Sequence, residues 1–327
     1  MSSQPEKIFA IGDVHGCASE LRMLLNKLPL TPESKVIFLG DYVDRGPQSK
    51  QVIDTVLELQ KSCKVVTLKG NHEALFMAFL RDPSSEAAGM FIYNGGSATL
   101  HSYATPEGEY RIPRSHREFL EKLDLFHETE DYFFVHAGVP RIPLDRLDVE
   151  RHGHDFLWSR GPFLRSSYRW NKLIIHGHTP VKAVDIRENR INIDTACVFD
   201  RTLTALELPE RRIYSVKRQA RARHVYLRDP GDRRDAVRFR GALPVYVQRG
   251  EDMHEFETID YSEFGMLMRD ITHLDREVLQ AGEEISGQIG SQDHALVDFQ
   301  GTVLRVLRDD GGISYALQLS FVGDTRF

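Results

Sequence analysis

The sequence predicts an α/β fold followed by a small β-barrel, and three observations carry this prediction. Up to about residue 210 of the 327-residue chain, short apolar runs alternate with amphipathic stretches, which is typical of a layered α/β domain. The composition then becomes basic from Arg211 to Arg240. Beyond Arg240, short alternating runs separated by turn residues replace the helical periodicity, as expected for a small β-barrel.

The elements of the first part follow from these apolar runs. Five runs have the length and composition of buried strands: residues 8–11, 36–39, 65–68, 133–135 and 173–175. Residues 18–27 and 48–60 have the apolar spacing of amphipathic helices. We expect strands at 190–193 and 202–208 to form a pair that closes the domain.

The second part is expected to begin after a basic linker. We place the first domain at residues 1–210, the linker at 211–228 and the barrel at 229–327, with a Pro-Gly break at Pro230 and Gly231. The expected barrel strands are 243–247, 256–259, 265–268, 284–289, 295–307 and 314–321.

The overall composition excludes several classes of protein. The apolar fraction of 41% and the charged fraction of 28% are those of a globular protein, and a net charge of −6 argues against a nucleic-acid partner. Cys17, Cys63 and Cys197 show no paired spacing, so we expect free thiols in a reducing compartment. The N-terminus lacks the apolar core of a signal peptide, and no apolar run could span a membrane. We therefore expect a cytoplasmic protein.

Metal-ligand side chains follow the expected strands of the first part. They are Asp13 and His15 in GDVHG, Asp41 in GDYVDRG, Asn71 in GNHE, His136 in HAGVP and His178 in HGHTP. Loops at the carboxyl ends of strands in an α/β sheet converge on one crevice. Mixed oxygen and imidazole ligands without thiolate predict two divalent ions, with Mn²⁺ expected first and Fe or Zn as alternatives. Two such ions would activate a water for phosphate-ester hydrolysis.

Four further residues supply chemistry that metal ions alone do not. Arg45 and Arg160 carry planar guanidinium groups that can hold phosphoryl oxygens. His72 follows Asn71 directly and is expected to protonate the leaving oxygen. Asp44 is expected to orient His72 and to raise the pKa of its imidazole.

Each of these residues alone would be an ordinary cap, turn or structural side chain, and the joint pattern carries the interpretation. The five motifs resemble those of the phosphoprotein phosphatase family over roughly residues 5–208, in particular its bacterial and phage members. The resemblance implies a metallophosphoesterase β-sandwich flanked by helices. It also implies that Asp13, His15 and Asp41 bind the first metal, and that Asp41, Asn71, His136 and His178 bind the second. His176, two positions before His178, is expected in the core or behind the ligands.

A related class, the symmetrical dinucleoside tetraphosphate hydrolases, shares the metal motifs. Its members typically carry Ala where this chain has Asp44, and GNHD where this chain has GNHE ending in Glu73. These two residues favour the protein-phosphatase branch. Phosphotyrosine and phosphohistidine remain open beside phosphoserine and phosphothreonine, because bacterial members often accept them.

The last part of the chain contains a second pattern. Arg233, Arg234 and Arg238 form an arginine cluster, and Asp260, Ser262 and Gly265 follow at the end of an alternating run. Clustered arginines bind phosphates and stack on purines, and a short Asp/Ser loop can hydrogen-bond a guanine edge. The order RxxxR, strand, DxSxxG resembles a PilZ domain over roughly residues 228–325. The resemblance implies cyclic di-GMP as the ligand.

The combined interpretation is a metal-dependent phosphoprotein phosphatase that cyclic di-GMP regulates or targets. Its substrate would be a phosphoprotein. One alternative is a cyclic di-GMP receptor or adaptor in which the hydrolase half is weak, and another is an enzyme directed at nucleotides.

Overall fold

The computed structural model describes residues 7–105, 109–219, 239–240, 242–249, 252–262, 265–272, 277–290, 296–309 and 312–323. Contacts divide the chain into two compact units. The first contains Met1–Ala74 and Ala98–Arg221, and the second contains Leu75–Ser97 and Ala222–Phe327. The second unit therefore takes a piece of chain from the middle of the expected first domain.

The first unit contains two five-stranded sheets. One has the order β10-β9-β1-β2-β3, with β1 parallel to β2 and β2 parallel to β3; the other has the order β4-β5-β6-β8-β7, with β5, β6 and β8 parallel. The strands of the first sheet are β1 (Ile8–Ile11), β2 (Lys35–Phe38), β3 (Lys64–Thr67), β9 (Thr202–Leu208) and β10 (Arg212–Lys217). The strands of the second are β4 (Phe126–Glu128), β5 (Tyr132–Val135), β6 (Leu173–His176), β7 (Asp185–Ile186) and β8 (Arg190–Asn192).

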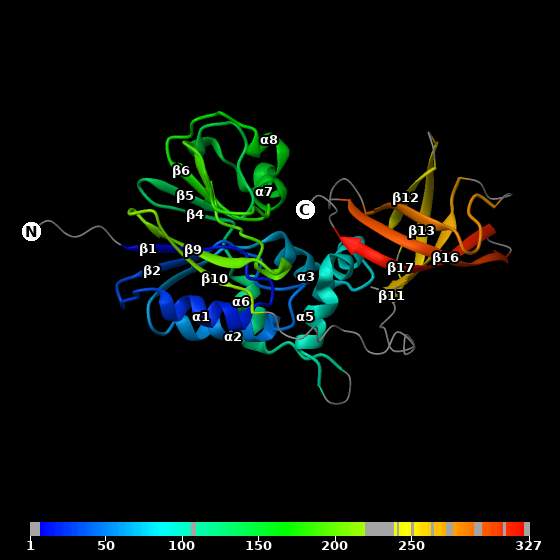
Figure 1. The fold of residues 1–327 in the computed structure, drawn as a ribbon, viewed down its shortest axis with the longest axis horizontal. Helices are drawn as coiled ribbons and strands as arrows, with labels where there is room; N and C mark the ends of the chain where they lie inside the picture. The colour runs from blue at the N-terminus through cyan, green and yellow to red at the C-terminus, as the bar shows by residue number, and fades with distance from the viewer. Residues whose placement is uncertain are drawn as a thin grey trace, which may run out of the picture. The chain divides into compact units, whose positions relative to one another are not determined.

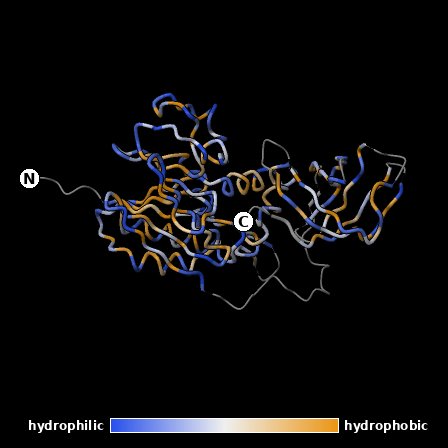
Figure 2. The backbone as a smooth tube through the Cα atoms, turned by 45° about the horizontal axis from the view of Figure 1, so that its top comes forward, coloured by the Kyte–Doolittle hydropathy of each residue, from blue (hydrophilic) through white to orange (hydrophobic). Residues whose placement is uncertain are grey.

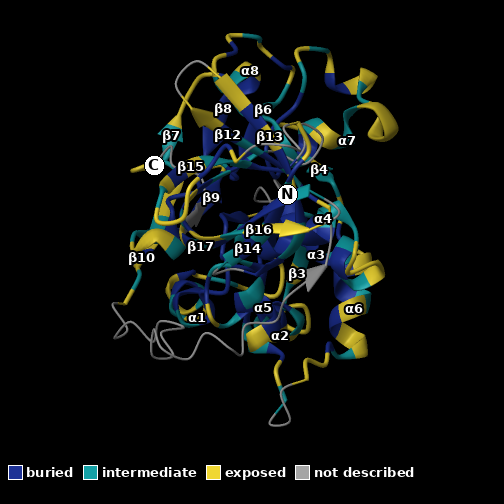
Figure 3. Ribbon diagram, turned by 90° about the vertical axis from the view of Figure 1, so that its right-hand side faces the viewer, coloured by how far each residue is buried: buried dark blue, intermediate teal, exposed yellow. Residues whose placement is uncertain are grey.

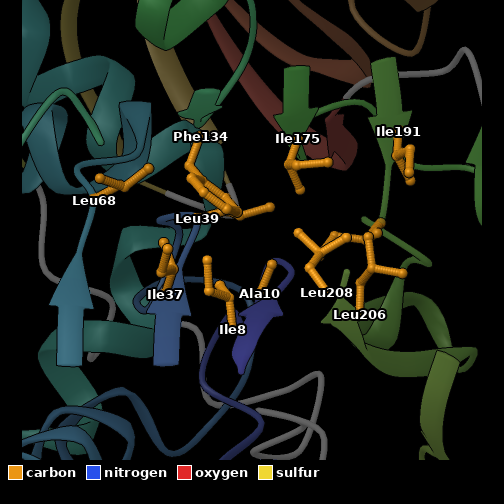
Figure 4. Close-up of a cluster of buried hydrophobic side chains, with 11 residues drawn as sticks. Ile8, Ala10, Ile37, Leu39, Leu68, Phe134, Ile175, Ile191, Leu206 and Leu208 are labelled. Atoms are coloured by element: carbon orange, nitrogen blue, oxygen red, sulfur yellow. The ribbon is translucent and has the colours of Figure 1, made fainter. Parts of the chain in front are cut away.

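Apolar side chains from the two sheets share one core. Ile8 and Ile37 of the first sheet belong to the same buried cluster as Phe134, Ile175 and Ile191 of the second (Figure 4). Hydrophobic stretches of the backbone gather in the interior of this unit (Figure 2). Burial of these side chains is the main force that holds the two sheets together as a sandwich.

Helices cover the outer faces of this sandwich. α1 packs on β9 and β10 (Figure 1), while Phe156 of α7 and Phe163 of α8 join a second apolar cluster on the outer face of β5 and β6. The helices keep exposed residues on their solvent sides (Figure 3). Their bounds are α1 (Ala18–Lys27), α2 (Ser49–Leu59), α6 (Arg114–Glu121), α7 (Val149–Trp158) and α8 (Gly161–Leu164), with short 3₁₀ turns η2 (Leu144–Arg146) and η3 (Cys197–Phe199). The expected α/β sandwich flanked by helices is confirmed.

Two expectations about the end of this unit need revision. The expected pair of strands at 190–193 and 202–208 is wrong as a pair, because β8 lies in the second sheet and β9 lies between β1 and β10 in the first. The expected linker begins at Arg211, but residues 212–217 form β10, which pairs antiparallel with β9. Residues 220–228 of that linker lie outside the described residues.

One helical segment connects the two units along the chain. It runs through α3 (Asn71–Arg81), α4 (Glu86–Phe91), the π-helix η1 (Ile92–Gly96) and α5 (Ser97–Ser102). Gly95 has a φ of 96° inside η1 and breaks the helical run there, a conformation that glycine adopts without a Cβ penalty. Residues 75–97 of this segment belong to the second unit, whereas its two ends belong to the first.

The second unit contains a closed barrel. Its sheet has the order β11-β13-β12-β15-β16-β17-β14, and the additional β13–β14 pairing closes the six strands that follow β11. All ladders are antiparallel. The strands are β11 (Phe239–Arg240), β12 (Pro244–Arg249), β13 (Asp252–Ser262), β14 (Gly265–Asp270), β15 (Glu284–Ile289), β16 (Val297–Asp309) and β17 (Gly312–Gly323). The expected small β-barrel is confirmed.

Two simple features agree with the sequence. Cys17, Cys63 and Cys197 are free thiols. Among the described residues, the helices are all too short or too polar to cross a bilayer.

Candidate metal centre

The expected ligands are carried by loops at the carboxyl ends of the parallel strands. Asp13 and His15 follow β1, Asp41 follows β2, and Asn71 begins α3 just after β3. In the second sheet, His136 follows β5 and His178 follows β6. All six side chains are buried, and hydrogen bonds connect them across sequence separations of up to 165 residues.

Titratable side chains at the centre, the expected proton donor His72 among them, gather into two groups that share Asp41. His15, Asp41 and His72 form one group, and Asp41, His136 and His178 form the other. Oδ2 of Asp41 lies 3.3 Å from Nε2 of His15, while its Oδ1 lies 3.5 Å from Nε2 of His136. Each carboxylate oxygen thus faces a different group, which is the arrangement that a bridging ligand requires.

Backbone carbonyls fix the orientation of two of the imidazoles. Nδ1–H of His15 donates to Val43 O (2.8 Å), and Nδ1–H of His136 donates to Leu39 O (2.9 Å). Because a carbonyl can only accept, the Nε2 atom of each neutral ring carries the lone pair that points into the centre. Metal-binding histidines are commonly oriented in this way.

These residues fit divalent cations. The lone pair of His136 Nε2 faces Asn71 Oδ1 at 3.0 Å and Asp41 Oδ1 at 3.5 Å, and a cation would stabilise such a cluster of electron-pair donors. Burial lowers the pKa of His136 to about 4 and raises the pKa of Asp41 to about 7. Neutral imidazoles offer lone pairs to a positive ion, and a buried carboxylate whose pKa is raised is stabilised in its charged form by such an ion.

Asp13 lies beside this centre but outside both groups. Its carboxylate accepts the backbone N–H of His178 at 3.0 Å. Burial, together with the nearby carboxylates of Asp194 and Asp41, raises its pKa well above the usual range. Its role as a ligand therefore remains a prediction.

Five of the expected site residues have left-handed backbone conformations. The φ angles of His15, Asp41, Asp44, Arg45 and His178 lie between 42° and 72°. Non-glycine residues rarely adopt this region, and each instance costs about 1–2 kcal/mol. Such strain concentrates at functional sites that the surrounding structure over-determines.

Glu73 holds the loop that carries Asp41. Its Oε2 accepts the backbone N–H groups of Asp41 and Gly70, both at 2.9 Å, and its Oε1 accepts those of Tyr42 at 2.8 Å and Val43 at 3.2 Å. Four backbone donors thus converge on one fully buried carboxylate. Burial raises the pKa of Glu73 to about 7. The sequence marked Glu73 only by its family pattern, not by this role.

His72 and Asp44 form the expected pair. His72 Nδ1 lies 2.6 Å from Asp44 Oδ2, and its Nε2 lies 3.9 Å from Asp41 Oδ2. The expectation that Asp44 raises the pKa of His72 is wrong, because burial and the Arg45 charge hold that pKa well below its ordinary value. Burial also raises the pKa of Asp44. Asp44 therefore lies where it can orient the imidazole through Nδ1, and both side chains are buried.

The two expected phosphate-binding arginines each contact a different histidine of the centre. Arg45 Nη1 lies 3.0 Å from His15 Nε2, and Arg160 Nε donates to His178 Nε2 at 3.1 Å. Both side chains are partly exposed, so they lie where the buried centre meets solvent. Arg45 also packs over the Phe199 ring at 5.4 Å.

His176 belongs to the core, in line with its expected position. It is fully buried, its ring meets Phe163 edge-on at 4.9 Å, and Nδ1 lies 3.1 Å from Gly177 O. Burial lowers its pKa to about 3.

Three buried side chains at the centre were not anticipated from the sequence. Thr99 and Ser49 surround Asp44, with the Thr99 hydroxyl donating to Asp44 Oδ1 at 2.6 Å. Asp194 lies close enough to Asp13 to influence its pKa. Asp194 directly follows the expected strand at 190–193. The rule that identified the ligands, a carboxylate at a strand end, could therefore have identified Asp194 as well. Nothing in the sequence around Thr99 points to Asp44.

The barrel shows only part of the expected ligand site. Asp260 and Ser262 lie at the end of β13, Gly265 begins β14, and Ser262 pairs with Gly265 across the hairpin. The Ser262 hydroxyl donates to Gly265 O at 3.3 Å. Arg233, Arg234 and Arg238 lie outside the described residues.

Comparison with known proteins gives matches for both parts of the chain. Residues 6–202 match the family model of the calcineurin-like phosphoesterases, and residues 232–325 match that of the PilZ domain. A protein of Anoxybacillus flavithermus named bis(5'-nucleosyl)-tetraphosphatase PrpE [asymmetrical] is 34% identical over 234 residues, which cover 63% of this chain and 92% of the relative. A protein of the same name from Geobacillus sp. is 32% identical over 235 residues, covering 64% and 94%. The crystal structure of a candidate diadenosine tetraphosphatase is similar in fold, with a TM-score of 0.52 and 21% identity over 68% of this chain and 97% of that one.

Proposed function

Because the chain belongs to the calcineurin-like phosphoesterase family and ends in a PilZ domain, we propose that it is a metal-dependent phosphoprotein phosphatase that responds to cyclic di-GMP. The observation that carries the proposal is the buried Asp44–His72 pair, with its 2.6 Å contact, beside two groups of ligands that share Asp41.

The ligands Asp13, His15, Asp41, Asn71, His136 and His178 would hold two divalent cations. When bound, these cations would activate a water and neutralise charge on the phosphoryl group. Mn²⁺ suits this mixture of carboxylate, amide and imidazole, with Fe or Zn as alternatives.

The residues of the chain itself account for the other steps. Arg45 and Arg160 hold phosphoryl oxygens through their planar donor groups and align the phosphorus. His72 delivers its Nε2 proton to the leaving oxygen, and the Asp44 carboxyl, whose pKa is raised by burial, replaces that proton through Nδ1. The alkoxide of a serine or threonine leaves poorly without such a proton, so this pair favours phosphomonoesters of proteins.

The names of the relatives support a second candidate, hydrolysis of dinucleoside tetraphosphates. Asp44 and Glu73 were expected to argue against this class. The leaving group in that reaction is itself a phosphate, which departs as an anion and needs little help from an acid. The two candidates therefore differ in how strongly they depend on His72.

The deciding experiment compares kcat/KM with Mn²⁺ for a phosphoserine peptide and for diadenosine tetraphosphate, in wild type and in His72→Asn. The proposal predicts efficient peptide turnover that falls by about 10²–10⁴-fold in the variant. Preferred turnover of the dinucleotide, with little effect of His72→Asn, would transfer the assignment to the second candidate. Turnover of neither substrate with any divalent metal would favour a receptor or adaptor.

The barrel is proposed to bind cyclic di-GMP through Arg233, Arg234 and Arg238 and through Asp260, Ser262 and Gly265. The pairing of Ser262 with Gly265 supports this proposal, because it brings two residues of the expected motif together where β13 meets β14. Titration calorimetry with Arg234→Ala/Arg238→Ala tests it: binding should be lost, and unchanged affinity would exclude this site.

A further inference from the structure

Thr99 is hydrogen-bonded to Asp44, the carboxylate that contacts His72. The Thr99 hydroxyl donates to Asp44 Oδ1 at 2.6 Å, and its oxygen, Oγ1, accepts the backbone N–H of Asp44 at 2.8 Å. Ser49 Oγ lies 3.1 Å from the Thr99 hydroxyl and 3.2 Å from the same N–H. Thr99, Ser49 and Asp44 are all fully buried. Water therefore cannot replace the Thr99 hydroxyl, and the Asp44 side chain depends on it.

The backbone of Asp44 adds to this dependence. Its φ of 72° places it in the left-handed region, which non-glycine residues adopt infrequently, although aspartate does so more often than most. The two hydrogen bonds from Thr99 engage both the backbone and the side chain of Asp44. A shift of Thr99 would thus move both groups at once.

Thr99 lies two residues after the end of the segment that belongs to the barrel unit. α5 follows η1 directly along the chain, after the kink at Gly95, and the unit boundary falls between Ser97 and Ala98. The same segment begins in α3, whose first two residues are Asn71 and His72. Residues 75–97 of the barrel unit are therefore flanked in the chain by His72 on one side and by Thr99, which contacts Asp44, on the other.

Inside the barrel unit, this segment packs tightly on β13. The Tyr93 ring of η1 stacks on Tyr261 with centroids 5.3 Å apart. A Cβ added to Gly89 would lie 2.5 Å from Leu243 Cδ1 and 2.7 Å from Tyr261 Oη, so α4 lies in close contact there. Tyr261 is fully buried and lies between Asp260 and Ser262 in the strand. Alternate residues of a strand point to opposite faces, so Tyr261 faces away from the side that these two residues present.

We propose that Thr99 is a positioning residue for the Asp44–His72 pair and that the segment from α4 to α5 transmits the state of β13 to it. This inference rests on the proposed function and adds the route of regulation. A ligand that engages Asp260 and Ser262 would shift Tyr261, and Tyr93 would carry the shift through η1 to Thr99. A small displacement suffices, because a hydrogen bond weakens steeply as its distance and angle depart from the optimum.

The first test uses the leaving group as its readout. In Thr99→Val, the rate with a phosphoserine peptide should fall about 10–100-fold, because this ester needs the proton donor. The rate with p-nitrophenyl phosphate, whose leaving group is already acidic, should change by less than about threefold. Thr99→Ser keeps the hydroxyl and should restore the peptide rate.

Two results would overturn the positioning role. One is an equal loss with both esters in Thr99→Val, which would indicate a general structural effect. The other is no recovery in Thr99→Ser while Mn²⁺ binding and circular dichroism match wild type. If wild type hydrolyses neither ester, the proposed function fails and this inference fails with it. That result differs from the two above, in which wild type is active and only the role of Thr99 is overturned.

The second test addresses the coupling. Cyclic di-GMP should change the phosphoserine-peptide rate more than the p-nitrophenyl phosphate rate in wild type, and this difference should disappear in Tyr93→Leu. The matched control Tyr110→Leu, at a residue that is 40% exposed, should keep it. A cyclic di-GMP effect that is equal on both esters, absent, or intact in Tyr93→Leu would overturn the proposed route.

Discussion

The substitution Glu73→Gln tests how the metal loop is held. Each oxygen of the Glu73 carboxylate accepts two backbone N–H groups. An amide keeps only one of these oxygens, and its NH₂ group would face two donors. Two hydrogen bonds to an ionised acceptor are lost, at about 1.5–3 kcal/mol each, so we expect a loss of about 3–6 kcal/mol in the free energy of unfolding.

The measurement belongs at pH 8, because the pKa of Glu73 is about 7 and the carboxylate is ionised above it. Urea unfolding in the presence of a chelator can be followed by tryptophan fluorescence, since Trp158 and Trp170 both lie in the phosphoesterase unit. Titration with Mn²⁺ then measures metal affinity. We expect it to fall about 10–100-fold, as for other groups that orient ligands.

The matched control is Glu118→Gln. Glu118 is exposed on α6 and pairs with Arg114 at 2.7 Å, so its loss should cost less than about 1 kcal/mol. If Glu73→Gln unfolds within about 1 kcal/mol of wild type and binds Mn²⁺ within threefold, the four backbone contacts do not hold the loop as argued.

Other consequences can be checked with standard assays. Asp13→Asn should lower turnover by about 10²-fold or more while circular dichroism stays unchanged; near-wild-type turnover would contradict its role as a ligand. Arg45→Lys should raise KM for p-nitrophenyl phosphate about tenfold, because an ammonium cannot form two parallel hydrogen bonds; an unchanged KM would remove Arg45 from phosphate binding. The folded pKa of His176 is about 3, against 6.5 when unfolded, so its contribution to stability is lost as pH falls below 6.5, by about 2 kcal/mol at pH 5. His176→Phe should lose correspondingly less stability than wild type between pH 7 and pH 5, and parallel losses would refute this.

Much of the fold was predictable, because buried strands appear in the sequence as short apolar runs and amphipathic helices as regularly spaced apolar residues. The expected helix at 18–27 coincides with α1, and the expected strands at 8–11, 202–208 and 284–289 coincide with β1, β9 and β15. The bounds of the other expected elements differ by a few residues. The error at 190–193 and 202–208 has a physical origin. Both runs are buried and strand-like, but periodicity cannot tell which of two facing sheets a strand joins.

The candidate site was predictable where residues act through their own chemistry, and less so where they act through geometry. Histidines and carboxylates that directly follow strands are typical metal ligands, so the position of His136 and His178 at the centre was expected from the sequence. Thr99 was not, because a threonine in a short helix is ordinary and its relation to Asp44 depends on tertiary packing across 55 residues of sequence. The pKa of His72 was misjudged because the degree of burial is not readable from sequence.

Because residues 75–97 belong to the barrel unit, the two domains cannot be separated by a single cut in the chain without dividing that unit. A fragment that ends near residue 210 would keep α4 and η1 but lose Leu243 and Tyr261, the apolar partners of Gly89 and Tyr93. A fragment that starts after residue 221 would lack Gly89 and Tyr93 and would leave Leu243 and Tyr261 without these contacts. The sequence resembles a simple fusion of two domains joined end to end, but the barrel unit includes residues 75–97 of the first domain. We therefore expect that a cut at the apparent domain boundary would destabilise both fragments.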